Sequence, residues 1–177
     1  MTRVRTTTTP WDVVTGSVEH TQQVGEALGR TLAPGDVIAL HGELGSGKTT
    51  LIQGIARGLG RAPESIKSPT FVLMREHPGE VPLVHVDGYR LAGAASAAWL
   101  DVELIFAPGK ITLIEWAERF EGLLPQAHLA IRLRHVSTNR RRIALAPSGP
   151  RAEAIVTRVR EALPQPAAPE PDASESA

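Results

Sequence analysis

The chain has 177 residues, of which 42% are hydrophobic, and its 19 Lys and Arg residues balance its 19 Asp and Glu residues. This length is typical of one domain that buries about 70% of the surface exposed by its unfolded chain. Zero net charge excludes a global field that attracts nucleic acid or membrane, and the lack of cysteine excludes disulfides, thiolate catalysis and cysteine-ligated zinc.

Hydrophobic periodicity and turn residues predict strands that alternate with helices early in the chain and a hairpin near its end. Ser17 is placed to cap the first helix, and a Pro34-Gly35 turn opens the second strand. The expected strands cover residues 11–14, 36–41, 71–77, 83–87, 111–115, 128–134 and 142–146. The expected helices cover residues 17–32, 50–59, 94–106 and 151–163.

A glycine-rich loop joins the second strand to the second helix. It reads Gly42-Glu43-Leu44-Gly45-Ser46-Gly47-Lys48-Thr49, followed by Thr50, and it fits the nucleotide-binding pattern G-x-x-x-x-G-K-[ST]. Glycines allow several backbone N–H groups to point at one anion. Lys48 brings a cation to the β- and γ-phosphates, and the Thr49 hydroxyl is placed to ligate Mg²⁺. Residues 42–49, here called the phosphate loop, therefore predict nucleotide binding.

These elements predict an α/β fold with a P-loop NTPase-like central sheet, parallel in the middle, with antiparallel edge strands and flanking helices. We expect a single domain over residues 11–163, a flexible arm over residues 1–10 and a disordered tail rich in Pro, Ala and Glu over residues 164–177. No apolar run reaches the length of a membrane span, and the first residues lack the apolar segment of a secretion signal. A cytoplasmic protein with no membrane contact is expected.

Two of the expected strands end in an acid, at Asp87 and at Glu115. In folds with a phosphate loop, a carboxylate at the end of a neighbouring buried strand helps to hold Mg²⁺. Either acid is a candidate for this role, with the other orienting the attacking water. The alternative is that each acid only caps the turn after its strand.

Three other features remain open from the residues alone. The Ser68-Pro69-Thr70 segment is either an ordinary turn or a loop whose hydroxyl reaches the γ-phosphate or the metal. A basic cluster near the hairpin either contacts tRNA phosphates or an acidic partner, or protects an edge strand from aggregation. The cluster consists of Arg132, Arg134, Arg140, Arg141 and Arg142. The six histidines show no metal-ligand spacing, which argues against zinc.

Four blocks in order give the chain a family resemblance. They are the loop region from His41 to Thr50, then Ser68-Pro69-Thr70-Phe71, then His85-Val86-Asp87-Gly88-Tyr89-Arg90-Leu91, then Ile114-Glu115-Trp116-Ala117-Glu118. Over residues 16–146 the chain resembles the bacterial TsaE family of tRNA threonylcarbamoyladenosine (t6A) biosynthesis ATPases. Many families share the phosphate loop, and the later blocks are the more specific ones.

The resemblance implies an ATPase that acts with two partners, the threonylcarbamoyl transferase subunit and that subunit's inactive paralogue. It would hydrolyse ATP to reset this pair, weakly alone and faster with the partners, and would meet tRNA indirectly through the complex. Lys48 would bind phosphates, Thr49 would bind Mg²⁺, and Thr70 would occupy a switch-like position. Asp87 and Glu115 would serve the metal and the water. Trp116 would either shape the nucleotide pocket or brace Glu115.

Other classes of protein fit part of the pattern. A small-molecule or nucleoside kinase also carries a phosphate loop, and the arginines of the hairpin would then clamp the transferred phosphate. A regulatory GTPase is disfavoured because the chain has no Asn-Lys-x-Asp motif to read guanine. An adaptor that binds nucleotide only to control assembly differs from the ATPase mainly in its turnover. Arg90 is the internal candidate for an arginine finger.

Overall fold

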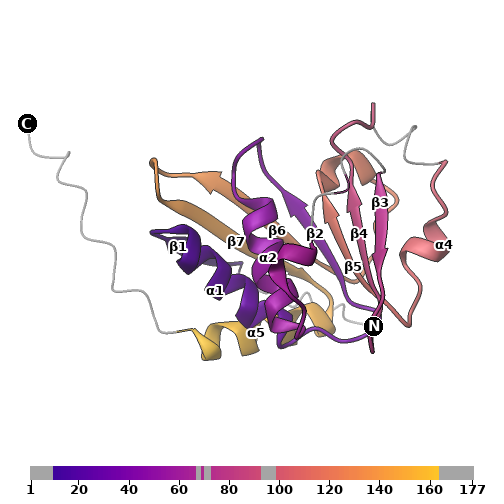
Figure 1. Cartoon of the computed structure of the whole chain (residues 1–177), viewed down its shortest axis with the longest axis horizontal. Coiled ribbons are helices and arrows are strands. Elements are labelled where there is room, and N and C mark those ends of the chain that lie inside the picture. The colour runs from indigo at the N-terminus through magenta and orange to yellow at the C-terminus, as the bar shows by residue number, and fades with distance from the viewer. Residues whose placement is uncertain (1–9, 67–68, 70–72, 93–98, 164–177) are drawn as a thin grey trace, which may run out of the picture.

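The computed structural model describes residues 10–66, 69, 73–92 and 99–163, which form one sheet with helices around it (Figure 1). The strands are β1 (Trp11–Thr15), β2 (Val37–His41), β3 (Met74–His77), β4 (Leu83–Asp87), β5 (Ile111–Glu115), β6 (His128–His135) and β7 (Arg141–Ser148). The α-helices are α1 (Val18–Gly29), α2 (Lys48–Gly58), α4 (Val102–Ile105) and α5 (Pro150–Ala162). Two 3-10 helices are η1 (Pro63–Ser65) and η2 (Ala117–Phe120). The expected tail and residues 1–9 of the expected arm lie outside the described residues.

The sheet has the strand order β1-β7-β6-β2-β5-β4-β3. Strands β6, β2, β5 and β4 pair in parallel at its centre. Strand β3 pairs antiparallel at one edge, and β7 and β1 continue the sheet antiparallel at the other. This arrangement confirms the predicted α/β class with a parallel middle and antiparallel edges. None of the helices in the described part of the chain is long and apolar enough to span a bilayer.

Residues of the central strands alternate between two hydrophobic cores, one on each face of the sheet. Ile38 and Leu40 of β2 belong to the core that α1, α2 and α5 complete, whereas Val37 and Ala39 belong to the core that contains Ile105 of α4. Figure 1 shows α1, α2 and α5 gathered on one face. Burial on both faces explains why these strands are nearly continuous apolar runs.

Helices α1 and α2 pack so closely that only glycine fits where they meet. The facing residues are Gly25 and Gly29 of α1 and Gly54 and Gly58 of α2. A Cβ atom placed on Gly25 would lie 2.9 Å from the Cα of Gly54, and one placed on Gly54 would collide with the carbonyl oxygen of Gln22. Because α2 begins within the phosphate loop, this contact sets the position of the loop against α1.

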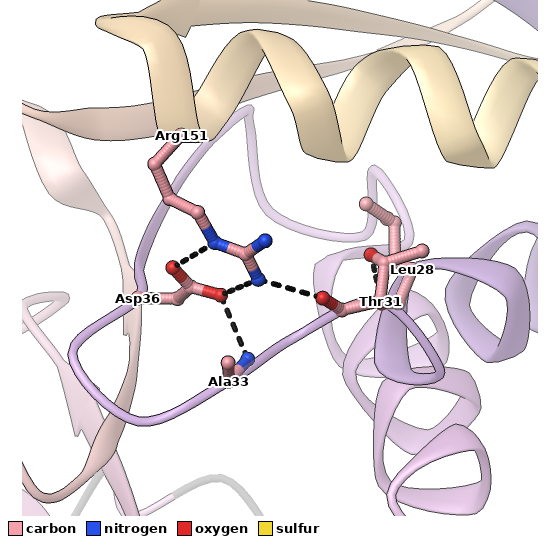
Figure 2. A network of polar contacts seen from close by, with 5 residues as sticks. All are labelled: Leu28, Thr31, Ala33, Asp36 and Arg151. Carbon is pink, nitrogen blue, oxygen red and sulfur yellow. Dashed lines mark hydrogen bonds and ion pairs between the residues drawn. The ribbon is translucent and has the colours of Figure 1, made fainter.

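A partly buried ion pair joins the start of β2 to the start of α5 (Figure 2). Arg151 donates to both carboxylate oxygens of Asp36, at 2.9 and 2.7 Å, and to the carbonyl of Thr31 at 2.7 Å. The same carboxylate accepts a hydrogen bond from the N–H of Ala33 at 2.8 Å. A bidentate pair of this kind is both strong and directional. It therefore holds the loop between α1 and β2 in one conformation.

The first helix is shorter than the sequence-based expectation. Helix α1 ends at Gly29, before the expected residue 32, and Pro34 disfavours helical backbone at Ala33. The hydroxyl of Thr31 also donates to the carbonyl of Leu28 at 2.7 Å, which satisfies one carbonyl of the last turn.

The expected helix over residues 94–106 is confined, in its described part, to the single turn of α4. Asp101 caps this turn by accepting a hydrogen bond from the N–H of Leu104 at 3.0 Å. Its own backbone is extended, so the helix cannot begin before Val102. Residues 94–98 lie outside the described part of the chain, as do residues 71–72 of the expected strand that is described from Met74 onward as β3.

We expect Gly54→Ala to lower the free energy of unfolding by about 2 kcal/mol, because its methyl group forces α1 and α2 apart. This loss exceeds the gain of about 1 kcal/mol that alanine brings to a helix interior. Urea denaturation followed by circular dichroism measures the change. Gly109→Ala is the control, since a Cβ there meets open space, and it should change stability by less than about 0.5 kcal/mol. Equal stability of both variants would show that the helices separate without cost.

Candidate active site

The phosphate loop turns sharply between β2 and α2. Gly42, Gly45 and Gly47 have φ angles of 150°, 75° and 105°, a region that side chains other than hydrogen strongly disfavour. Helix α2 begins at Lys48, two residues before its expected start, so its first N–H groups belong to the motif itself. The first N–H groups of a helix have no partner within the helix and attract anions. The loop therefore has the backbone geometry of a phosphate-binding site.

Lys48 is buried beneath the loop, with 5% of its surface exposed. Its Nζ donates to the carbonyl of Gly42 at 2.6 Å and to that of Glu43 at 2.9 Å. Burial lowers the pKa of Lys48 below its ordinary value, and the nearby carboxylates of Glu115, Glu118 and Asp87 oppose this shift. The ammonium group is thus held at the loop by its backbone carbonyls and by the charges around it.

Trp116 forms a wall next to this ammonium group. The Lys48 Nζ lies 4.3 Å from the centroid of the indole ring, within the range of a cation–π contact, and the centroid of the Tyr89 ring lies 5.2 Å from that of the indole. Trp116 follows β5 directly and adopts a left-handed backbone with φ of 56°, which is strained for a bulky residue. Of the two roles left open from the sequence, this geometry favours shaping the pocket around Lys48.

The alternation of β4 and β5 places both candidate acids on the face that α2 covers. Asp87 lies four residues after Leu83, and Glu115 lies two residues after Leu113, and these leucines pack in the core with α2. The two acids are directly opposite each other in the parallel register, and both are buried. The N–H of Gly88 donates to the carbonyl of Glu115 at 3.0 Å, which ties the two strand ends together.

The two acids make different side-chain contacts. Glu115 Oε2 accepts a long hydrogen bond of 3.5 Å from the Thr49 hydroxyl, so this carboxylate faces the phosphate loop. Asp87 Oδ1 accepts a hydrogen bond of 2.9 Å from the N–H of Tyr89, the capping contact that the alternative interpretation requires. Asp87 also lines the cavity at the loop, so a capping contact and a second role there are compatible.

Two cavities meet at Trp116. One, of about 480 Å³, lies beside the loop and is lined by Lys48, Thr49, Thr50, Asp87, Glu115 and Trp116, with Leu44 and Tyr89 at its border. The other, of about 670 Å³, lies across the indole and is lined by His41, Glu43, Ser46, Glu118, Arg132 and Arg134. The first cavity brings together the residues that the sequence assigned to phosphate and metal.

The oxygen donors in the first cavity suit Mg²⁺ better than other metals. They include the hydroxyl of Thr49 and the two carboxylates of Asp87 and Glu115. Mg²⁺ prefers such hard donors and keeps several waters or phosphate oxygens as further ligands. Among the described residues there is no group of three or more His, Cys, Asp or Glu side chains able to hold a metal alone. The donor set therefore fits a metal that arrives with a nucleotide.

Sequence reasoning missed a buried histidine in this site. His85 lies in the middle of β4 with no exposed surface, and its Nε2 is 2.8 Å from Glu115 Oε1. Metal-ligand spacing, the feature that singles out histidines in a sequence, is lacking at His85. A polar residue in the otherwise apolar run Leu83–Val86 was the available signal, because a buried imidazole needs a hydrogen-bond partner.

The arginines of the hairpin do not lie on an edge strand, so the anti-aggregation interpretation is wrong. Strand β6 lies between β2 and β7, and β7 lies between β6 and β1. Arg132 and Arg134 alternate with the buried Ile131 and Leu133, and both arginines line the larger cavity. Arg141 donates to the carbonyls of Ser137 and Thr138, each at 3.1 Å, and so holds the hairpin turn. Arg140 and Arg142 are exposed.

Thr70 lies outside the described residues, together with Ser68. Its switch-like role stays a prediction. Pro69 is described and buried, and its carbonyl accepts a hydrogen bond of 2.7 Å from the N–H of Leu73.

The fold and the loop together define an α/β protein of the phosphate-loop class. Comparison with known proteins narrows this class. The family model "Threonylcarbamoyl adenosine biosynthesis protein TsaE" matches residues 15–143, more than half of the chain. The chain belongs to the TsaE family.

Relatives that carry the name tRNA threonylcarbamoyladenosine biosynthesis protein TsaE match over most of their length. The Bacillus subtilis protein is 36% identical over 77% of this chain and 85% of its own, and the Treponema pallidum protein is 38% identical over 75% of this chain and 98% of its own. The Mycobacterium tuberculosis protein is 42% identical over 72% of this chain and 80% of its own. The crystal structure of YdiB from Bacillus subtilis is similar, with a TM-score of 0.70, 30% identity, and coverage of 86% of this chain and 95% of that one.

The pKa of Lys48 should lie below its ordinary value of 10.5, and Glu115→Gln should lower it further. The direction follows because burial disfavours the ammonium form, whereas the Glu115 carboxylate favours it until the substitution removes its charge. A titration of ¹³C-labelled lysine followed by NMR gives the pKa. Glu121→Gln changes an exposed carboxylate and should leave it unaltered. A Lys48 pKa that rises in Glu115→Gln would contradict this account of the site.

Proposed function

We propose that this chain binds and hydrolyses MgATP as a subunit of the machinery that makes threonylcarbamoyladenosine in tRNA. The observation that carries the proposal is the convergence of Lys48, Thr49 and Glu115 on the cavity beside the phosphate loop. The names of the TsaE relatives support the pathway. A site made for positioning and charge stabilisation supports phosphoryl transfer, here proposed to occur to water.

In this proposal the triphosphate lies on the N–H groups of the loop from Gly45 to Thr49. Lys48 exchanges its two loop carbonyls for phosphate oxygens, and Trp116 limits where its ammonium group can move. Mg²⁺ would be held by Thr49 and by Glu115 or Asp87, and it would neutralise charge between the β- and γ-phosphates. The acid that does not bind the metal orients the attacking water, and Thr70 acts near the γ-phosphate.

The nucleoside would leave the loop on the side away from the acids. A cavity of about 120 Å³ lies there, lined by Thr21 of α1, by Thr50 and by Thr138 and Asn139 of the hairpin. Loop glycines Gly45 and Gly47 line both this cavity and the one with the acids. A nucleotide that spans the loop would therefore place its base near α1 and the hairpin turn.

The residues that line the cavity beside the phosphate loop support a catalytic site that partner subunits complete. Lys48 is the one cationic side chain among the described residues that line it. Phosphoryl transfer to water generally needs a further cation at the transferred group, often an arginine supplied by another subunit. Leu44 and Tyr89 at its border are 73% and 45% exposed, as expected of residues that a partner covers. We propose the transferase subunit and its inactive paralogue as these partners, with ATP hydrolysis resetting the pair and tRNA contacted only through the complex.

A kinase remains the alternative function, and the position of the arginines does not favour it. Arg132 and Arg134 line the cavity across Trp116, and Arg141 is bonded to carbonyls of its own turn. An arginine-rich lid would instead cover the transferred phosphate beside Lys48. The products distinguish the two functions, since a kinase yields a phosphorylated acceptor and a hydrolase releases phosphate.

Lys48→Ala should abolish phosphate release from MgATP while the fold survives, because it removes the cation at the β- and γ-phosphates. The measurement is phosphate release by the full chain, alone and with the partner pair. Wild type should be slow alone and accelerated by the pair. Lys110→Ala, which changes a lysine paired with Glu76 before the start of β5, is the control and should hydrolyse normally. Unchanged turnover in Lys48→Ala, or fast hydrolysis by wild type without partners, would refute the proposal.

Asp87→Ala and Glu115→Ala should each lower the hydrolysis rate by at least about a hundredfold, the scale of losing a key electrostatic or base group. Steady-state kinetics with the partner pair present measure the loss. Asp12→Ala, an exposed acid on edge strand β1, is the matched control and should be unaffected. If Asp87→Ala turns over normally, its capping contact with Tyr89 is its whole role.

A further inference from the structure

We propose that His85 is a positioning residue for Glu115, holding one carboxylate oxygen so that the other faces Thr49 and the metal. The inference rests on the proposed function, because it assigns Glu115 to the metal or the attacking water. It concerns a side chain that does not itself line the cavity beside the loop. His85 would therefore act on the reaction only through Glu115.

The sheet register explains how the two side chains meet. Asp87 lies directly opposite Glu115 in the parallel β4–β5 pair, and His85 is two residues before Asp87 on the same face. The imidazole reaches diagonally to Glu115, with 2.8 Å between His85 Nε2 and Glu115 Oε1. Both side chains are almost completely removed from solvent, with exposed fractions of 0% and 4%. Water therefore does not compete for this hydrogen bond.

The surroundings of the ring assign its proton. His85 Nδ1 is buried and has no hydrogen-bond partner among the described residues. A carboxylate oxygen accepts hydrogen bonds, so the contact with Glu115 places a proton on His85 Nε2. His85 thus donates from Nε2 to the carboxylate.

Because of this hydrogen bond, the two oxygens of Glu115 have different contacts. Oε1 is bonded to His85, and Oε2 is the oxygen 3.5 Å from the Thr49 hydroxyl. A carboxylate fixed at one oxygen keeps the other oriented toward the metal or the water. Hydrogen bonds that orient ligating side chains commonly change metal affinity or activity by about 10–100-fold.

The site of His85 would suit an aliphatic residue if packing were its only purpose. The other buried positions of β4 before its terminal acid are Leu83, Val84 and Val86. Burying an imidazole is unfavourable unless its polar atoms are paired, and Glu115 is its described side-chain partner. His77 on β3 offers a comparison, because its ring lies 6.4 Å from that of His85 and only 9% of its surface is exposed.

Three variants, assayed as full chains with the partner pair and MgATP, test the assignment. His85→Leu should lower kcat by about 10–100-fold with little change in KM for MgATP, because the interaction acts after binding. His85→Gln restores a donor near the position of Nε2 and should recover most of this loss. His77→Leu should keep kcat at the wild-type level. A loss of kcat in His77→Leu equal to that in His85→Leu, or no recovery with Gln, would overturn the proposal.

A double variant separates positioning from general packing. Because His85 acts through Glu115, adding His85→Leu to Glu115→Gln should cause no further loss of kcat. A further loss as large as that of His85→Leu alone would show that the two residues act independently, and the proposal would fail.

A measurement that does not depend on hydrolysis tests the role of His85 separately from the proposed function. NMR of ¹⁵N-labelled histidine at neutral pH reports the tautomer of each ring, and His85 should carry its proton on Nε2. A proton on Nδ1 alone would overturn the inference even if all variants were active or if His85→Leu failed to fold. If wild type neither binds nor hydrolyses MgATP, the proposed function fails whatever the tautomer. Normal wild-type hydrolysis with an unimpaired His85→Leu overturns only the role of His85.

Discussion

The parallel register of three strands is the constraint on which the site depends. Leu40 at the end of β2 lies opposite Glu115 of β5, which lies opposite Asp87 of β4. Because the carboxyl ends of parallel strands meet at one edge of the sheet, this pairing brings both acids to the edge from which the phosphate loop leaves. A slip of one residue in β5 would turn Glu115 to the opposite face, away from Thr49 and α2.

Two further contacts hold the loop against this edge. The glycine-lined crossing of α1 and α2 fixes the position of α2, the helix that begins in the loop. The Asp36–Arg151 pair fixes the start of β2, the strand that leads into the loop (Figure 2). Neither contact touches the cavity with the acids. Their effect on function is thus indirect, through the position of the backbone N–H groups that receive the phosphates.

The sequence allowed the fold class and most elements to be predicted, because apolar runs and glycine turns are local signals. It also indicated the pairing of the loop with two strand-ending acids. It did not distinguish the acids, because the direction in which Glu115 and Asp87 point depends on register and on neighbours distant in the chain. The hydrogen bond of His85, the contact of Trp116 with Lys48 and the interior position of the hairpin strands are likewise long-range. Local periodicity does not encode such contacts.

The most direct test of the account is a crystal structure of the chain with Mg²⁺ and a non-hydrolysable ATP analogue. The account predicts phosphates on the N–H groups from Gly45 to Thr49, with the Lys48 ammonium group turned from the loop carbonyls to the phosphates. It also predicts a metal next to the Thr49 hydroxyl, with Glu115 Oε1 still bonded to His85. A nucleotide bound in another cavity, or a metal that both acids fail to approach, would contradict it.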